Sequence, residues 1–304
     1  MDFVIYFLTM AKITKLNPLI LEKVWGGQKL IPFHKTQLQN IGETWEVSTL
    51  KEGSSFLGDK ALSEFCELSY LVKFIDTSDH LSIQVHPDDE YAKQHEKSKG
   101  KTETWIILDA EEGSGIYLGL KPGVTKKEFK NALSSGMQVN QFLQFHEVKK
   151  NDFFSVPAGT IHAIGSGVTL CEIQQSSGIT YRVWDWNRMG LDGKPRELHI
   201  DKAMDSINFK EDFYKKQVLP YQKNMNSFSG INTLYDHPDF KVQFISKIKN
   251  GKLSLNLNEQ ESIIVLEGKI LGDIELNKFE AALVLERGHF EFEVSSDIEL
   301  VLVS

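Results

Sequence analysis

The 304-residue sequence has two cysteines, eight prolines, and neither a long basic block nor a long apolar run. Cys66 and Cys171 lie far apart without the spacing of a metal site, which favours reduced thiols in a cytoplasmic protein. No Lys/Arg block is long enough to follow a phosphate backbone and the formal net charge is −8, so we expect no nucleic-acid partner. An anionic substrate would therefore need local positive charge.

The apolar run at the N-terminus, FVIYFLTM, is too short to cross a bilayer, and neither a basic segment nor a small-residue cleavage site accompanies it. We therefore expect no signal peptide and no membrane partner. Met10 is followed by polar residues and turn signals. Residues 1–9 are interpreted as an extension from an upstream start, with a place in the fold as the alternative.

Apolar segments of strand length dominate the sequence and predict a mostly β fold. They are rich in Val, Ile, Phe and Leu and are separated by Gly, Asn, Asp and Pro; examples are SYLVKFID, LSIQVH, ETWIILDA, GVTLCEIQQ and ITYRVWDW. A second block of short strands starts near Tyr235 and continues to the C-terminus, as in a second small sandwich or barrel. With 209–229 as the connector, we predict one domain over 10–234 and another over 235–304.

A helical sequence pattern interrupts the strands over about 124–145. Thr125 can cap a helix there, Glu128 stands three residues later as in a capping box, and apolar residues recur at helical spacing. The segments 64–71 and 88–97 are the other helical or irregular pieces that we expect, the second introduced by Pro87 and two aspartates.

The pattern Pro-Ala-Gly-Thr-Ile-His at 157–162 follows an apolar strand and predicts a tight turn that delivers His162 into a sheet. A single histidine in such a place is more often a hydrogen-bonded core residue than a ligand. Gln84 and His86 change the interpretation, because residues two apart in a strand project to the same face. Two imidazoles and an amide oxygen could then share one centre.

Glu103 stands at the mouth of the apolar strand in GKTETWIIL, two residues after Lys101. Taken alone, it is more often an exposed charge before a strand. Together with Gln84, His86 and His162, it completes a set of nitrogen and oxygen donors suited to zinc, with a position left for water or substrate.

Several segments, in order, resemble the type I mannose-6-phosphate isomerases, in the shorter form common in Gram-positive bacteria: LEKVWGGQKL, IGETWEVS, LSIQVHPDD, GKTETWIIL, VPAGTIHAIGSG and CEIQQSSGITYRVWDWNR. The resemblance runs from about Met10 to the C-terminus. It implies a cupin with two jelly-roll β-barrel domains and a small helical insertion. The second β block lacks the Pro-x-Gly-x-x-His pattern, so we expect the C-terminal domain to be metal-free. The implied reaction is the reversible conversion of D-mannose 6-phosphate to D-fructose 6-phosphate at one zinc ion.

The resemblance carries the zinc ligands of the family onto Gln84, His86, Glu103 and His162. It carries the proposed catalytic residues onto Lys101, Glu172 and Arg182, and substrate contacts onto Lys73 and Arg182. The general cupin pattern has Gly six residues before the proline and Asn four residues after the histidine, where this chain has Asn151 and Ser166. That departure weakens a generic cupin assignment but leaves the histidine ligand in place.

Aldose–ketose isomerisation needs a base, a route for protons between oxygens, and positive charge beside the enediolate. We assign charge stabilisation to the metal, Lys101 and Arg182, with Arg182 alternatively clamping the phosphate. Glu172 is the candidate proton shuttle, and Asp185 and a metal-bound water are its rivals. Lys73 stands in an otherwise apolar strand. This position is equally compatible with a role in the site and with a side chain that reaches out to water.

Two other interpretations are open. Two histidines and one carboxylate also form the iron site of cupin dioxygenases, but the additional Gln84 and the Lys and Arg cluster favour zinc and a sugar phosphate. A sugar-phosphate-binding cupin without catalysis would not need Lys101, Glu172 and Arg182 together. We expect a monomer rather than a homodimer.

Overall fold

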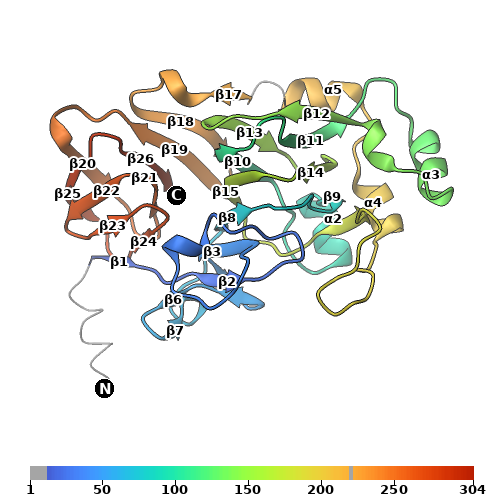
Figure 1. The fold of residues 1–304 in the computed structure, drawn as a ribbon. Helices are drawn as coiled ribbons and strands as arrows, with labels where there is room; N and C mark the ends of the chain where they lie inside the picture. The colour runs from blue at the N-terminus through green and yellow to red at the C-terminus, as the bar shows by residue number, and fades with distance from the viewer. Residues whose placement is uncertain (1–11, 219–221) are drawn as a thin grey trace. The chain divides into compact units, whose positions relative to one another are not determined.

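The computed structural model describes residues 12–218 and 222–304, so the interpretation of residues 1–9 lies outside the described residues. Strands dominate the described chain, which confirms the predicted mostly β class (Figure 1). The α-helices of this part are α2 Asp89–His95, α3 Lys126–Ser134, α4 Ile200–Ser206 and α5 Glu211–Phe213. Within the described ranges, no helix has the length and apolar composition needed to span a membrane.

Two compact units divide the chain discontinuously. Unit 1 contains residues 12–20, Thr44–Phe74 and Met225–Ser304, and unit 2 contains Leu21–Glu43 and Ile75–Asn224. These units do not coincide with the predicted division at residue 234, because β1 (Ile13–Lys15) pairs with β24 (Ala281–Val284) near the other end of the chain. Assigning a catalytic domain to residues 10–234 therefore remains a prediction.

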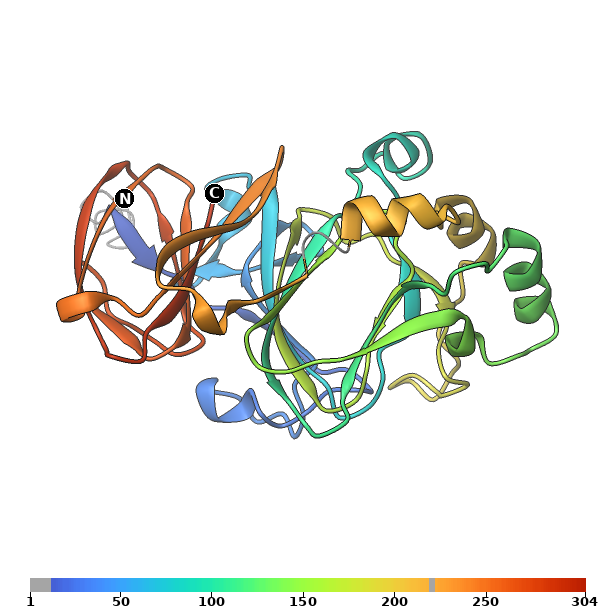
Figure 2. The same ribbon diagram turned by 90° about the horizontal axis from the view of Figure 1, so that it is seen from above.

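Unit 2 is built from two sets of antiparallel strands. The strand order is β12-β11-β14-β9-β16 in one set, and β17, β13, β10 and β15 are successive neighbours in the other. Their bounds are β9 Ile83–Val85, β10 Glu103–Ala110, β11 Gly115–Leu120, β12 Leu143–Glu147, β13 Asp152–Val156, β14 His162–Ile164, β15 Val168–Gln175, β16 Tyr181–Trp184 and β17 Lys223–Asn224. Figure 2 shows these strands curving around a shared interior. Side chains from both sets, such as Trp105, Phe154 and Leu118, form one buried cluster there.

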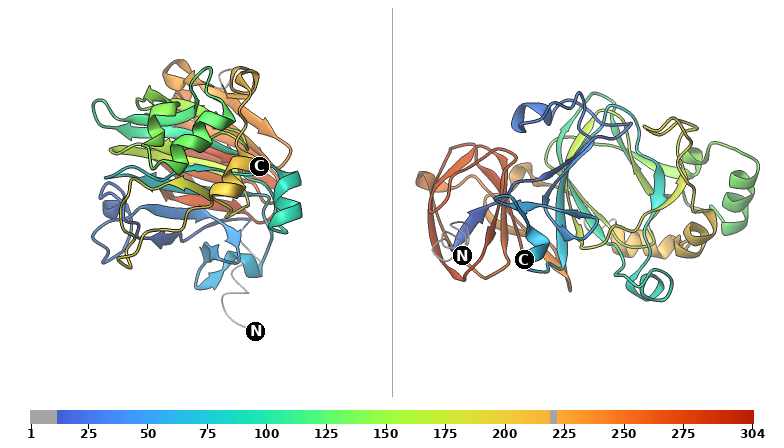
Figure 3. Two further views of the ribbon diagram at one scale, coloured as in Figure 1. Left: turned by 90° about the vertical axis from the view of Figure 1, so that its right-hand side faces the viewer. Right: turned by 90° about the horizontal axis from the view of Figure 1, so that it is seen from below.

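Helices cover the outer face of the five-stranded sheet (Figure 3, right). Phe129 of α3 and Met204 of α4 pack in one buried cluster with Val85 of β9 and Ala163 of β14. Since side chains alternate across a strand, the residues next to Val85 and Ala163 face the interior of unit 2. Gln84 and His162 are therefore directed inward.

The predicted helical insertion is confirmed over part of its range. Thr125 and Glu128 form the expected capping box at the start of α3, with Glu128 N–H donating to Thr125 Oγ1 at 3.2 Å. A 3₁₀ turn, η3 (Val139–Phe142), follows, but 143–147 form strand β12, which pairs with β11. The helical range ends early because this segment completes the sheet.

The shorter predictions had mixed outcomes. The helix expected within 88–97 is α2, and Asp88 caps it by accepting from the Tyr91 N–H. In the segment 64–71, helical structure is confined to the first residue, where the 3₁₀ turn η2 (Leu62–Glu64) ends. Strand β8 (Tyr70–Asp76) begins before the segment ends. The connector over 209–229 contains α5 and the π-helix η4 (Tyr214–Val218), whose Val218 is fully buried. The predicted connector is thus helical over 211–218.

Unit 1 contains a second β sandwich, with sheet orders β1-β24-β21-β26-β19-β18 and β20-β25-β22-β23. Their bounds are β18 Gly230–His237, β19 Phe240–Ser246, β20 Lys252–Leu257, β21 Ser262–Glu267, β22 Lys269–Gly272, β23 Leu276–Asn277, β25 Gly288–Val294 and β26 Glu299–Val303. The remaining strands are β2 Leu19–Leu21, β3 Glu43–Val47, β4 Thr49–Leu50, β5 Gly53–Ser54, β6 Phe56–Leu57 and β7 Lys60–Ala61. Leu255 and Phe290 of one sheet and Ile263 and Leu300 of the other share a buried cluster.

Glu46 of β3 is buried in unit 1, and its Oε1 has no hydrogen-bond partner among the described residues. Burial raises the pKa of this carboxyl from 4.5 to about 8. Between these two values the folded chain holds a proton that the unfolded chain has lost, so stability falls as pH rises. We expect the free energy of unfolding of Glu46→Gln, relative to that of the parent, to increase by about 1.4 kcal/mol for each unit by which the pH rises across this window.

Urea unfolding at pH 5 and pH 8 measures that difference. Glu52→Gln, at an exposed position, is the matched control and should leave the two values nearly unchanged relative to the parent. An equal effect of Glu46→Gln at both pH values would contradict this account.

Candidate metal centre

Three neighbouring strands of unit 2 bring the candidate ligands to one face. His162, the first residue of β14, lies directly opposite Gln84 of β9, and Gln84 lies opposite Arg182 of β16. His86 follows β9 by one residue. The turn before His162 is held by Gly159, whose φ is +86° and whose N–H donates to the His86 carbonyl at 2.9 Å. Glycine adopts this left-handed conformation at little cost, so the predicted turn is confirmed.

His86, Glu103 and His162 converge in the interior of unit 2. Their candidate ligand atoms all lie within 4.8 Å of one another, and the three side chains are at most 1% exposed. Glu103 Oε1 is 3.1 Å from His86 Nε2, and Glu103 Oε2 is 3.7 Å from His162 Nε2. The chain thus groups the two imidazoles and the carboxylate that the sequence singled out.

Backbone carbonyls fix the orientation of both rings. His86 Nδ1 lies 2.8 Å from the Ile179 carbonyl oxygen, and His162 Nδ1 lies 2.9 Å from that of Thr160. A carbonyl only accepts, so each Nδ1 carries the proton and each Nε2 presents its lone pair to Glu103. Burial lowers the pKa of His86 to about 3 and also lowers that of His162. Both rings are therefore neutral donors of the kind that metal ions require.

Glu103 carries a buried negative charge. Burial opposes its ionisation, but the Lys101 ammonium outweighs burial and holds the pKa of the carboxyl well below its usual value. Lys101 Nζ lies 2.7 Å from Glu103 Oε1 and is itself buried. Both Glu103 oxygens and His86 Nε2 lack a well-formed hydrogen bond within the described chain. Buried lone pairs of two imidazole nitrogens and a carboxylate around a common point fit a divalent cation.

Gln84 also borders this point, with Nε2 3.2 Å from His162 Nε2. In this orientation the amide donates to the imidazole. The two ends of an amide are interchangeable by a rotation about the last side-chain bond, and only Oε1 can bind a metal. Gln84 therefore fits the ligand set through its oxygen.

Glu172 lies near the ligands on the neighbouring strand. In the pairing of β10 with β15, Trp105 is opposite Glu172 and Glu103 is opposite Gln174, which places all four side chains on one face of the sheet. Trp105 Nε1 donates to Glu172 Oε2 at 3.1 Å. Sequence reasoning missed Gln174, which is fully buried and whose Oε1 lacks a partner in the described ranges. The sequence did contain a signal for this residue, because Gln174 is a polar residue two positions after Glu172.

Arg182 and Asp185 differ in their surroundings. Arg182 is half-buried and donates through Nη1 to the Glu197 carbonyl at 2.8 Å, while its buried Nε has no partner within the described chain. Asp185 is held by Arg188 at 2.8 Å and by Arg196 Nε at 2.7 Å. Burial opposes ionisation of Asp185, but its two arginines lower the pKa. A carboxylate held in this way is a poor proton acceptor, which favours Glu172 over Asp185 and leaves a metal-bound water as the other alternative.

Lys73 belongs to unit 1, whereas the grouped ligands belong to unit 2. Its side chain is buried and Nζ lies 4.7 Å from the centroid of the Trp45 ring. The predicted substrate contact of Lys73 remains a prediction. Asn151 stands where the general cupin pattern has glycine, and its φ is +70°. Asparagine tolerates this left-handed conformation, which glycine adopts easily.

Comparisons with known proteins agree with this geometry. Residues 31–104 match the family model of the phosphomannose isomerase type I catalytic domain. A probable mannose-6-phosphate isomerase of Bacillus subtilis, GmuF, is 41% identical over 218 residues, 63% of this chain and 67% of the relative. Another from that organism, ManA, is 37% identical over 211 residues, 63% of this chain and 66% of the relative.

A solved structure extends the likeness to nearly the whole chain. The crystal structure of the mannose 6-phosphate isomerase from Bacillus subtilis matches with a TM-score of 0.81 at 26% identity, covering 96% of this chain and 99% of that one. The fold thus matches the cupin fold expected from the sequence. By sequence and by fold, the chain belongs to the type I mannose-6-phosphate isomerase family.

Proposed function

We propose that this chain is a mannose-6-phosphate isomerase that interconverts D-mannose 6-phosphate and D-fructose 6-phosphate. The observation that carries the proposal is the buried convergence of His86, Glu103 and His162 beside Lys101, in a chain of this family. A purely structural core would not bury a lysine and a carboxylate beside two imidazoles, because burying charge is costly unless a function or a bound ion compensates.

The proposed cofactor is one zinc ion, held by Gln84, His86, Glu103 and His162. The donor set of two imidazole nitrogens and carboxylate and amide oxygens supports zinc. A solved structure of a mannose 6-phosphate isomerase bound with zinc and yttrium has the same fold, at 14% identity and a TM-score of 0.69. When bound, the ion would act as a Lewis acid toward the carbonyl oxygen of the sugar.

The reaction moves one proton between carbons and needs no external oxidant. The C2–H bond of mannose 6-phosphate breaks, the proton passes to a base, and the C1 carbonyl oxygen is protonated. The enediol then loses the C2 hydroxyl proton and gains a proton at C1, which leaves the ketone at C2. Glu172 is the proposed base, supported by its place on the face that carries Glu103.

Lys101 and Arg182 supply fixed positive charge. Lys101 Nζ is within 2.7 Å of a proposed zinc ligand and can also stabilise negative charge on a substrate oxygen. Arg182 lies across from Gln84, and its buried Nε lacks a hydrogen-bond acceptor in the described part of the chain. A guanidinium so placed suits an enediolate oxygen or the phosphate. The formal net charge of the chain is −8, so these local positive charges would be needed to attract an anionic sugar phosphate to the site.

The proposal places the enzyme in the cytoplasm, as a monomer. Neither Cys66 nor Cys171 forms a disulfide within the described residues, which supports a reducing compartment.

Turnover by the purified chain tests the proposed reaction. Conversion of mannose 6-phosphate to fructose 6-phosphate should disappear after chelation and return when zinc is added. A folded, zinc-loaded sample without conversion would refute the isomerase proposal. Return of activity with iron but not with zinc would refute the metal assignment.

Replacing His162 with Ala should remove both zinc and activity, because the variant loses a buried nitrogen donor. Zinc content by mass spectrometry and the turnover rate together measure this effect. His289→Ala, at an exposed histidine, is the matched control and should keep both. Full zinc occupancy in the His162 variant would contradict the ligand assignment.

Replacing Arg182 with Ala should leave zinc content unchanged and lower kcat/KM by roughly 10²- to 10³-fold, as expected when a group that stabilises developing charge is lost. Arg287→Ala, at an exposed arginine, should keep the parent rate. A parent-like rate for the Arg182 variant would exclude its catalytic role, and loss of zinc would show that Arg182 supports the metal centre instead.

A further inference from the structure

The segment that carries Lys101 is buried without belonging to a helix or a strand. Residues 96–102 join α2 to β10, and Gly100, Lys101 and Thr102 at its end are all buried. Buried peptide N–H groups outside helices and sheets need other partners. The Lys101 N–H donates to the Pro87 carbonyl at 3.0 Å. The N–H groups on either side of it donate to side chains instead.

Gln175 bonds to both main-chain polar groups of Thr102, the residue after Lys101. Gln175 is the last residue of β15 and is 2% exposed. Its Oε1 accepts from the Thr102 N–H at 2.8 Å, and its own N–H donates to the Thr102 carbonyl at 3.0 Å. The chain is therefore fixed directly after Lys101.

Asp89, the first residue of α2, bonds to the N–H on the other side of Lys101. Asp89 Oδ1 accepts from the Gly100 N–H at 2.8 Å and from Gln175 Nε2 at 3.2 Å. A peptide N–H needs an acceptor and a carboxylate needs a donor, so these contacts determine the orientation of the Gln175 amide. Gln175 and Asp89 thus hold the chain on both sides of Lys101, and we call this pair the Lys101 clamp.

The chain before Lys101 fits closely against the start of α2. A Cβ atom at Gly100 would lie 2.5 Å from the Asp88 carbonyl carbon and 2.6 Å from the Asp89 nitrogen, which is too near for any side chain. Ser177 adds a contact one residue earlier, because its Oγ donates to the Lys99 carbonyl at 3.0 Å. The segment is therefore tied both to α2 and to the residues at the end of β15.

Gln175 lies outside the face of β15 that borders the metal centre. Side chains alternate along a strand, so Gln175 points away from the face that carries Glu172 and Gln174. Both ends of its amide are engaged by the Lys101 clamp. Gln175 can therefore act on the centre through the main chain of Lys101, without touching a metal ligand.

We propose that Gln175 is a positioning residue of the isomerase. With Asp89, it fixes the backbone of Lys101 and thereby the ammonium that lies 2.7 Å from Glu103 Oε1. A lysine ammonium stands on a flexible four-carbon stem, so its place depends on a fixed main chain. A misplacement of about 1 Å can lower a rate roughly 10²-fold. The catalytic part of this inference rests on the proposed function of Lys101, whereas the clamp itself does not.

Replacing Gln175 with Met keeps the length of the side chain but removes its acceptor and its donor. We expect kcat to fall by about 10- to 10²-fold with little change in KM, because Lys101 would stabilise charge that develops in the transition state. Zinc content should stay at the parent value, since no proposed ligand is altered. A parent-like kcat in the folded, zinc-loaded variant would overturn the proposal.

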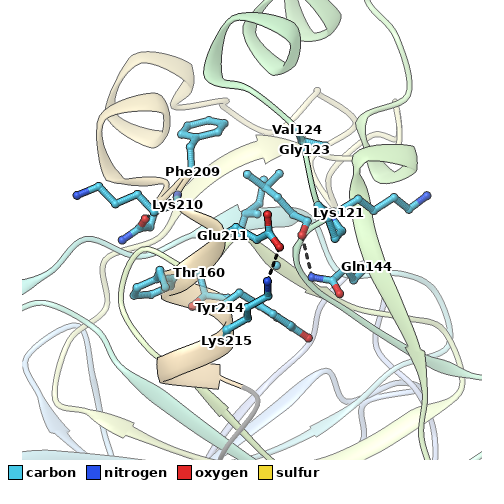
Figure 4. Close-up of a pocket in the computed structure, with 16 residues that line it drawn as sticks. Lys121, Gly123, Val124, Gln144, Thr160, Phe209, Lys210, Glu211, Tyr214 and Lys215 are labelled. Atoms are coloured by element: carbon cyan, nitrogen blue, oxygen red, sulfur yellow. Dashed lines mark hydrogen bonds and ion pairs between the residues drawn. The ribbon is translucent and has the colours of Figure 1, made fainter.

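Gln144→Met is the matched control. Gln144 Nε2 also donates to a carbonyl, that of Leu120 at 2.8 Å, but at the wall of a cavity of about 250 Å³ that neither Lys101 nor Gln175 lines (Figure 4). This variant should keep kcat within about twofold of the parent, because distant sites act independently. An equal loss of kcat in both variants would show a general effect on the fold and overturn the positioning role.

Two substitutions of Asp89 separate its charge from its hydrogen bonds. Asp89→Asn keeps an oxygen that can accept from both donors and should keep kcat within about twofold, whereas Asp89→Ala should lower kcat at least about fivefold. Glu90→Ala, at another exposed acidic residue in the first turn of α2, is the control and should keep the parent rate. Equal rates for the Asn and Ala variants would remove Asp89 from the clamp.

Replacing Lys101 tests whether Gln175 acts through it. In a Lys101→Met background, Gln175→Met should change kcat less than about twofold, because the group that Gln175 positions is absent. The same loss of kcat in the parent and in the Lys101→Met background would overturn the positioning role.

Amide hydrogen exchange, followed by NMR without substrate, tests the clamp independently of turnover. The Thr102 N–H should exchange at least about tenfold faster in Gln175→Met than in the parent, and Gln144→Met should leave its exchange unchanged. Unchanged exchange in Gln175→Met would overturn the clamp. Faster exchange with a parent-like kcat would overturn the positioning role. Faster exchange in a chain whose parent form has no isomerase activity would refute the proposed function but keep the clamp.

Discussion

The buried charge of Glu103 is the constraint on which the centre depends. Its carboxylate has no exposed surface, and an isolated charge in that environment would be very costly. Lys101 compensates part of it, but both neighbouring imidazoles are neutral, since burial lowers their pKa values. A divalent ion would complete the compensation and use the lone pairs that both rings direct toward Glu103.

The two faces of the five-stranded sheet carry different kinds of side chain, and this difference makes room for the buried centre. The outer face of the five-stranded sheet is apolar and packs against α3 and α4, so the inner face is free to carry Gln84 and His162. The same alternation places Glu103, Trp105 and Glu172 inward on the facing strands. Backbone carbonyls of Ile179 and Thr160, which no substitution removes, then fix the two rings. The centre is thus held largely by main-chain geometry.

Local patterns in the sequence predicted much of this arrangement. The alternation of residues 84 and 86 and the glycine turn before residue 162 predict inward side chains, and the structure brings these residues together with Glu103. Pairing between distant segments has no local signature, so the grouping of β1 with the C-terminal strands was not predicted. The two arginines that hold Asp185 stand only 3 and 11 residues after it, but in a segment without regular secondary structure, so spacing alone did not predict these contacts. The strand at 143–147 resembled a continuing helix because its partner, β11, lies far back in the sequence.

X-ray absorption at the zinc edge, on protein loaded to saturation, tests the central claim most directly. The account predicts one zinc per chain, two imidazole ligands, and otherwise only oxygen donors in the inner shell. Loss of one imidazole in His86→Ala would assign that ligand. Sulfur in the inner shell, or a single imidazole in the parent chain, would contradict the proposed centre.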